Sequence, residues 1–317
     1  MSDLLKRVDE RTKLAGTNKL EILLFTLGVD RTSQRRETYG INVFKVREVM
    51  RTPAITRAPE MPPAVEGMVS LRGALIPVVG LAKFISSFSP VDTDLPPSIM
   101  IVTEYNGQTQ GFLVEAVDTI LRLDWSAMRV PPSMMTAKLG GLVTAVSELA
   151  DGRLVMMLDV EKVLAETQQD DDSAMFRNLK PIDHKECTVF FADDSSIARR
   201  QISRTLDAMH VKHVSAVNGK EAWVELQKIA DYADASRQPV RDYVQLVLTD
   251  VEMPEMDGYM LTRKIKNDAR FAGIPVLMHS SLSGRSNQQL GRSVGVDEYV
   301  PKFEPHRLAE TVTRLLA

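Results

Sequence analysis

Three aspartates and one lysine in the second half of the chain constrain its fold most strongly. Each comes directly after a short apolar run: Asp193 and Asp194 after 188–192, Asp250 after 244–249, and Lys302 after 299–301. Such runs predict buried parallel strands. The carboxyl ends of parallel strands form one edge of an open sheet, and ligands bind at that edge. The sequence therefore predicts that the four side chains converge, although they lie far apart in the chain.

The whole segment from Cys187 onward alternates predicted strands with predicted helices. The strand candidates are residues 188–192, 211–217, 243–248, 274–279 and 297–300. The helix candidates are residues 196–209, 220–230, 259–267, 285–294 and 305–316. Five strand–helix units in succession predict a doubly wound α/β domain, a (βα)5 fold with a parallel five-stranded sheet and right-handed crossovers.

The part from Leu20 to about Val160 is rich in strands and turns instead. Asn106-Gly107 and Asp151-Gly152 are strong hairpin signals, and Arg72-Gly73 separates two further apolar runs. The expected helices are short, over 80–84 and 159–166. This pattern predicts an all-β domain, built as an antiparallel barrel or sandwich.

A polar and acidic segment separates the two parts. Residues 168–173 read Gln-Gln-Asp-Asp-Asp-Ser, and Pro181 lies beyond them. We interpret this acidic run as a solvated linker and not as a metal site. The predicted organisation is a β domain over 1–165, a linker over 166–185 and an α/β domain over 186–317.

Composition and charge argue against several classes of protein. With 39 basic and 42 acidic residues the net charge is -3, which argues against nucleic-acid binding, since that needs a concentrated basic surface. The one cysteine, Cys187, allows no intrachain disulfide and favours a reducing compartment. No apolar run approaches the ~18 residues that span a bilayer, and residues 1–20 lack the apolar core of a signal peptide. We expect a cytoplasmic protein that does not insert into the membrane.

The converging carboxylates predict a cation site. Like charges ~4 Å apart repel by about 4 kcal/mol at an effective dielectric of ~20, so three of them either raise a pKa or bind a cation. Mg²⁺ prefers carboxylate, water and phosphate oxygens. With the ion bound, one carboxylate can attack a phosphoryl donor, while Lys302 and the hydroxyl of Ser280 contact the incoming phosphate.

Each of these residues has an ordinary explanation when it is taken alone. Asp194 is a typical helix cap, Ser280 a typical turn residue and Lys302 a typical solvated side chain. The combination favours a functional site, because four compatible residue types fall at strand ends of one βα array.

Four motifs in this region resemble the response-regulator receiver domain. They are Ala192-Asp193-Asp194-Ser195, the run Thr-Asp-Val-Glu-Met-Pro-Glu-Met-Asp-Gly over 249–258, His279-Ser280-Ser281, and Tyr299-Val300-Pro301-Lys302. The resemblance spans about 186–317. It implies that Asp250 accepts a phosphoryl group from a histidine kinase, and that Asp193, Asp194 and Asp250 bind Mg²⁺ with the backbone carbonyl of Glu252. It also implies that Ser280 and Tyr299 form the switch pair and that Lys302 contacts the phosphate.

The chain departs from the receiver pattern at one position. The family usually has a proline after the lysine, often in a cis peptide, whereas here Phe303 follows Lys302 and Pro301 precedes it. A cis bond before Phe303 would cost ~3 kcal/mol or more. The departure therefore affects the conformation expected for the loop that orients the Lys302 side chain. Glu252 adds a negative charge beside the phosphate route, and we hypothesise that it slows hydrolysis of an aspartyl phosphate.

The first part contains no catalytic constellation, but three of its segments are similar to the CheW family over about 20–165. These segments are residues 39–49, 65–79 and 111–117. The resemblance implies a pair of small β-barrels that joins chemoreceptor tips to the histidine kinase CheA. Arg72, in Leu71-Arg72-Gly73, matches the arginine of the family motif and is our candidate interaction residue; the alternative is an ordinary exposed arginine in a turn.

Two other sets of residues favour structural roles. His210 and His213 have no further metal ligands nearby in the sequence, so a surface or strand role is the simpler interpretation. The methionine pairs 134–135 and 156–157 are predicted to belong to the core.

A CheW-like part joined to a receiver part resembles the CheV family of chemotaxis coupling proteins. The resemblance implies an adaptor at receptor arrays on the inner face of the membrane, controlled by CheA-dependent phosphorylation of Asp250. Such a chain is not a turnover enzyme, because it catalyses only the Mg²⁺-dependent transfer to its own aspartate.

Two other functions remain as alternatives, a phosphate sink and a phosphohydrolase. The receiver part could act as a phosphate sink that drains CheA, with the first part only localising it. A phosphohydrolase is expected to show a compact Asp-x-Asp motif, which the adjacent pair Asp193-Asp194 does not fit. A DNA-binding regulator is not expected, because the sequence ends with the last receiver helix and offers no basic helix-turn-helix.

Overall fold

The computed structural model describes the chain as two compact units. It describes residues 19–30, 33–86, 91–92, 98–105, 108–131, 142–167, 176, 179–182, 187–281, 291–302 and 304–317. Of the described residues, the β unit comprises those within 20–123 and 127–167, and the α/β unit comprises those within 176–317 together with Lys19 and 124–126. The sequence predictions made at Asn106-Gly107, Met134-Met135, residues 168–173 and Phe303 fall outside the described residues.

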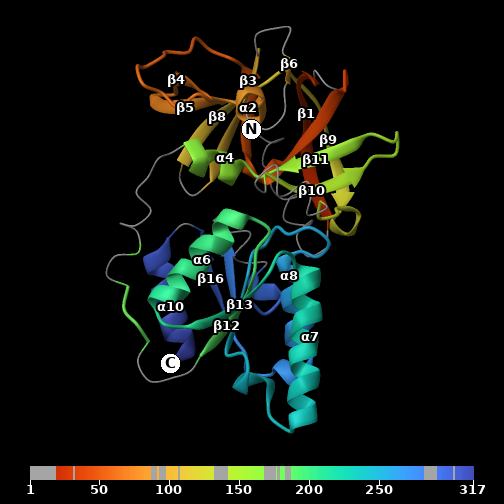
Figure 1. Cartoon of the computed structure of the whole chain (residues 1–317), viewed down its shortest axis with the longest axis vertical. Helices are drawn as coiled ribbons and strands as arrows, with labels where there is room; N and C mark the ends of the chain where they lie inside the picture. The colour runs from red at the N-terminus through yellow and green to blue at the C-terminus, as the bar shows by residue number, and fades with distance from the viewer. Residues whose placement is uncertain are drawn as a thin grey trace. The chain divides into compact units, whose positions relative to one another are not determined.

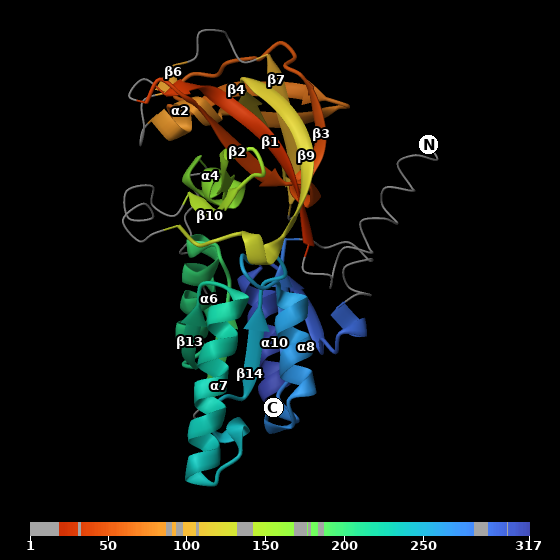
Figure 2. The same cartoon turned by 90° about the vertical axis from the view of Figure 1, so that its right-hand side faces the viewer.

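Two sheets build the β unit (Figures 1 and 2). One contains β1 (Lys19–Asp30), β2 (Arg36–Asn42), β6 (Val91–Asp92), β9 (Ala116–Asp124), β10 (Val143–Glu148) and β11 (Leu154–Leu158). Its order is β10-β11-β2-β1-β6, with β9 also paired to β1. The other contains β3 (Val46–Arg51), β4 (Val65–Leu71), β5 (Ala74–Gly80), β7 (Ile99–Tyr105) and β8 (Gln108–Val114), in the order β3-β7-β8-β5-β4.

The two sheets share a hydrophobic core. Phe25 of β1 and Phe112 of β8 belong to the same buried cluster, which also includes Val160 at the start of α4 (Val160–Thr167). The neighbour of Phe112, Leu113, lies in a separate cluster formed by the β3–β8 sheet. This is the alternation expected of a strand whose two faces are both covered. The all-β prediction is therefore confirmed, and the short helices are α2 (Leu81–Ser86) and α4. The expected purely antiparallel pairing was wrong, because β11 pairs with β2 and β5 pairs with β8 in parallel.

The α/β unit contains a parallel sheet of five strands in the order β13-β12-β14-β15-β16. The strands are β12 (Thr188–Ala192), β13 (Lys212–Ala216), β14 (Leu246–Thr249), β15 (Val276–Ser280) and β16 (Glu298–Pro301). The helices are α6 (Ser196–Ala208), α7 (Gly219–Ser236), α8 (Gly258–Asn267) and α10 (Pro305–Leu316). The predicted (βα)5 fold class is confirmed, and the helix predicted over 285–294 lies mostly outside the described residues.

Helices cover both faces of this sheet (Figure 1). Val189 and Phe191 of β12 pack in a cluster with residues of α6 and α10. Their neighbours Phe190 and Ala192 pack in another cluster with residues of α7 and α8. Because the four β12 residues from Val189 to Ala192 alternate between two cores, this part of the strand is apolar on both faces, and it fixes the sheet edge from which the polar residues project.

The helix α7 extends to Ser236, six residues beyond its predicted end at Ala230. Ala233 is fully buried, so the apolar stripe continues into the added turns. Arg237 ends the helix in the left-handed conformation, with φ of 55°, and Pro239 follows. The prediction was wrong because no glycine marks the end of the helix.

Part of the predicted linker packs on the α/β unit. Leu179 and Ile182 pack against the cluster that holds α6 and α10, and the Ile182 N–H donates to the Met209 carbonyl at 3.0 Å. The guanidinium of Arg204 lies 4.2 Å from the centre of the Phe176 ring.

No helix among the described residues has the length and apolar character needed to cross a bilayer.

Arg270 joins α7 to the connection that follows α8. Its Nη1 lies 2.9 Å from Asp231 Oδ1, and its Nη2 lies 2.7 Å both from Gln227 Oε1 and from Asp268 Oδ2. The hydrogen bonds from Arg270 lower the pKa of Asp268 from 3.8 to about 2. A carboxyl whose pKa is lower in the folded state stabilises the fold above its unfolded pKa, and this contribution is lost as the pH falls through the folded value.

We therefore predict that Arg270→Ala lowers the free energy of unfolding by about 1–2 kcal/mol at neutral pH. The difference from wild type should shrink between about pH 4 and about pH 2, where Asp268 becomes protonated. Urea unfolding followed by Trp223 fluorescence in a Trp125→Phe background measures it, since the chain has two tryptophans. The exposed Arg241→Ala should have little effect, and a difference that does not change with pH would contradict the role of Asp268.

Candidate functional site

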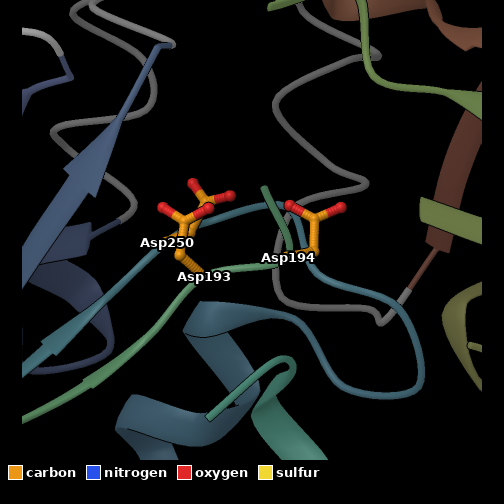
Figure 3. Close-up of side chains that lie close together, drawn as sticks. All are labelled: Asp193, Asp194 and Asp250. Carbon is orange, nitrogen blue, oxygen red and sulfur yellow. The ribbon is translucent and has the colours of Figure 1, made fainter. Parts of the chain in front are cut away.

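The three aspartates predicted to converge lie together at the carboxyl edge of the parallel sheet (Figure 3). Ala192 of β12 pairs in register with Thr249 of β14, so Asp193 and Asp250, which follow these two residues, lie side by side. The Asp250 N–H donates to the Ala192 carbonyl at 2.8 Å. One carboxylate oxygen from each of Asp193, Asp194 and Asp250 lies within 4.8 Å of the others.

Lys302 lies between two of these carboxylates. Its Nζ is 2.9 Å from Asp193 Oδ2 and 3.0 Å from Asp250 Oδ2. The side chains of Asp193, Asp250 and Lys302 are buried, and Asp194 is half-buried. Burial raises the pKa of Asp193 well above its usual range; Lys302 opposes the rise, and the charges of Asp250 and Asp194 add to it. The site thus concentrates negative charge where water cannot disperse it.

The residues present fit a divalent cation. Three ionised carboxylates and one ammonium carry a formal charge of -2, which one divalent ion would neutralise. The oxygens come from two adjacent strands and lie close enough to share a hard cation. Within the described ranges, this is the one group of three or more His, Cys, Asp or Glu residues that could hold a metal.

The loop after β14 closes tightly against the strand end that carries Asp250. The Gly258 N–H donates to the Val251 carbonyl at 2.9 Å, and the Asp257 carboxylate caps α8 by accepting the Met260 N–H at 2.6 Å. A Cβ on Gly258 would lie 1.9 Å from the Asp250 carbonyl oxygen. Glycine is therefore required at position 258, and the sequence signal for it is a glycine that directly follows the helix-capping Asp257.

Ser280 and Tyr299 lie on the neighbouring strands β15 and β16, and their side chains are close enough for Ser280 to influence the pKa of Tyr299. Burial is the main cause that raises the pKa of Tyr299; the Ser280 side chain opposes this, and the charges of Asp250 and Glu252 add to it. The Lys302 N–H donates to the Ser280 carbonyl at 3.1 Å. The main chain thus ties the lysine to the strand of the serine.

Glu252 is half-buried, and its charge contributes to raising the pKa values of Tyr259 and Tyr299. It therefore lies close enough to the site to act on it electrostatically. The role of its carbonyl oxygen as a metal ligand stays a prediction, as does the effect of Phe303 on the loop.

Arg72 lies in the β unit, at the turn between β4 and β5. It has φ of 50°, its side chain is 66% exposed, and its Nη2 is 2.9 Å from Glu48 Oε2 of β3. Exposed ion pairs contribute little to stability, so this contact leaves the arginine available at the surface. Its role in binding stays a prediction.

The residues with predicted structural roles lie as follows. The Nε2 atom of His213 lies 3.1 Å from Asp207 Oδ1, and the centre of its ring lies 5.7 Å from the centre of the Phe191 ring. His210 is exposed, with φ of 59°. Met157 is buried and Met156 packs partly buried against the main core of the β unit.

Comparison with known proteins finds two families on this chain. Residues 21–168 match the CheW-like domain, and residues 189–313 match the response regulator receiver domain. The chemotaxis protein CheV3 of Helicobacter pylori is 30% identical, with 88% of each chain covered. CheV1 of the same species is 29% identical, over 100% of this chain and 99% of the relative.

Solved structures similar to each part are also known. The scaffolding protein TtCheW of Thermoanaerobacter tengcongensis is 28% identical, covering 44% of this chain and 84% of that one, with a TM-score of 0.38. The chemotaxis protein CheY4 of Vibrio cholerae is 26% identical, covering 42% of this chain and 100% of that one, with a TM-score of 0.35.

The closeness of Gly258 to the Asp250 carbonyl gives a prediction about stability. Gly258→Ala should lower the free energy of unfolding by about 1–3 kcal/mol, because the added methyl group displaces the loop that holds Asp250. Gly291→Ala is the control, since its Cβ would meet neighbours no closer than 3.6 Å. Denaturant unfolding of both variants tests this, and equal stability would show that the loop accommodates a side chain.

Proposed function

The chain belongs to the CheV family of chemotaxis proteins, and we propose that it is an adaptor that couples chemoreceptors to the histidine kinase CheA under control of phosphorylation at Asp250. The observation that carries the proposal is the meeting of three carboxylates and Lys302 at one sheet edge, in a chain that also has a CheW-like domain. The proposed boundaries are 1–165 for the coupling domain, 166–185 for the linker and 186–317 for the receiver.

In the proposed reaction Asp250 is the nucleophile. One of its carboxylate oxygens attacks the phosphorus of a phosphohistidine, the phosphorus–nitrogen bond breaks, and an acyl phosphate forms on Asp250. Mg²⁺, held by Asp193, Asp194, Asp250 and the Glu252 carbonyl, would supply positive charge to the phosphoryl oxygens. Lys302 already contacts Asp250 at 3.0 Å, so its ammonium is within reach of the new phosphate.

The switch that follows is proposed to involve Ser280 and Tyr299. The hydroxyl of Ser280, on the strand next to β14, can donate to the phosphate. That donation would compete with the interaction between the Ser280 and Tyr299 side chains. A coupling free energy of about 1–3 kcal/mol between the phosphate and the docking surface is enough for a 5–150-fold change in affinity.

The coupling itself is assigned to the CheW-like domain, with Arg72 as the proposed contact residue. The match of residues 21–168 to the CheW-like domain supports binding of this domain to receptors and CheA. This function places the protein in the cytoplasm, at receptor arrays on the inner face of the membrane.

We predict that incubation with phosphorylated CheA and Mg²⁺ labels the wild-type chain with a hydroxylamine-labile acyl phosphate. Asp250→Asn should abolish the label, because an amide cannot form it, and EDTA should abolish it in the wild type. Asp207→Asn, which removes an exposed carboxylate elsewhere in the unit, is the control. A label that persists in Asp250→Asn would refute the assignment.

Receptor-stimulated kinase activity with the same variant separates the adaptor from the phosphate sink. An adaptor that carries Asp250→Asn still couples receptors to CheA, whereas a sink with this substitution loses its whole effect. Loss of all influence on the kinase would therefore favour the sink.

The charge of Glu252 gives a prediction about phosphate lifetime. Glu252→Asn should speed loss of the phosphate about fivefold, as for a barrier lowered by about 1 kcal/mol, because a negative charge near the attacking water is removed. The matched control is Glu255→Gln in the same loop, where Glu255 pairs with Lys220 at 3.0 Å. Release of labelled phosphate over time measures both, and equal rates in wild type and Glu252→Asn would refute the idea.

A further inference from the structure

We propose that Arg199 is a positioning residue for the cation site, holding the Asp193-Asp194 turn so that both carboxylates face the position shared with Asp250. This inference rests on the proposed function, since it concerns the same Mg²⁺ site. Its basis is one guanidinium nitrogen that contacts two consecutive peptides. Arg199 Nη1 donates to the Asp193 carbonyl at 2.8 Å and to the Asp194 carbonyl at 2.9 Å.

The position of Arg199 on α6 explains how its side chain reaches this turn. Ser195 caps the helix, and the Arg199 N–H donates to the Ser195 carbonyl at 3.0 Å, so Arg199 lies one turn into the helix. Side chains of a helix tilt toward its N-terminus. A long side chain at this position therefore extends back over the residues that precede the cap.

The turn is held from its other side as well. The Ser195 N–H donates to Asp193 Oδ1 at 2.9 Å, and Lys302 contacts Asp193 Oδ2. With Arg199 on the carbonyls, the peptide groups and the carboxylate of Asp193 are all fixed by directional bonds. Rotation of either peptide would move the attached carboxylates away from Asp250, so the clamp acts through the geometry of the ligands and does not require direct contact with the ion.

The charge of Arg199 makes the sign of its effect informative. A guanidinium near a cation site repels the ion, so its removal should strengthen Mg²⁺ binding if charge were its only influence. Loss of a group that orients ligands typically weakens metal binding about 10–100-fold. The two effects have opposite directions, and a single affinity measurement distinguishes them.

The test is calorimetric titration of the full chain with Mg²⁺. We expect Arg199→Gln to weaken Mg²⁺ binding about tenfold. Arg199→Lys should be intermediate, because its ammonium keeps the charge but lacks the planar geometry of the guanidinium. The matched control is Arg200→Gln, which removes the same charge from the next, exposed position and should bind as wild type does.

Several outcomes would overturn the proposal. Mg²⁺ affinity in Arg199→Gln equal to or above that of wild type would show that positioning is not its role. If thermal unfolding without Mg²⁺ shows that the Gln variant does not fold, the Lys variant decides: equal affinity to wild type overturns the proposal, and weaker affinity supports it. If the wild-type chain binds no Mg²⁺, the proposed function fails, whereas Mg²⁺ binding and phosphorylation unaffected by Arg199→Gln would remove only this inference.

Discussion

Repulsion among three carboxylates at one sheet edge is the constraint on which the rest of the α/β unit depends. Asp193 and Asp250 are held in place by the parallel pairing of β12 with β14, and both strands are anchored by apolar cores on their two faces. The sheet therefore cannot separate the charges without disrupting these cores. Lys302 offsets part of the repulsion through contacts with both aspartates. The remaining negative charge is what makes the edge suited to a cation and a phosphoryl group.

The loop between β14 and α8, which begins at Asp250, is also held in place by close contacts. A Cβ at Gly219, at the start of α7, would lie 2.3 Å from the Met256 carbonyl oxygen. Glu255, with φ of 64°, adopts the left-handed conformation and pairs with Lys220. Backbone strain of this kind persists only where the surroundings enforce it. The residues between β14 and α8 are thus held both by their own strand end and by α7, which limits how far the loop can move.

The sequence allowed prediction of the strand ends but not of contacts made through the main chain. Apolar runs followed by polar residues were enough to anticipate the convergence of the aspartates and Lys302. Hairpin signals in the first half indicated antiparallel pairing of strands adjacent in sequence, so the parallel pairs β2–β11 and β5–β8 were not anticipated. Arg199 was missed for a related reason: it contacts carbonyls, which every residue has, so neither its type nor its spacing marks it. The ion pair of Arg72 with Glu48 joins the turn between β4 and β5 to β3, which lies at the other end of the sheet order, so this contact also depends on tertiary structure.

Under the proposed function, Lys302 links the phosphorylation chemistry to the switch. Its ammonium pairs with Asp250, and its N–H is bonded to the carbonyl of Ser280. A phosphate on Asp250 would attract the ammonium away from its present position between two carboxylates. Because the main chain at Lys302 is tied to β15, such a shift acts on the strand that carries Ser280 and, through the hydroxyl of that serine, on Tyr299. A change of charge at one atom can therefore reach two strands through bonds that already exist before phosphorylation.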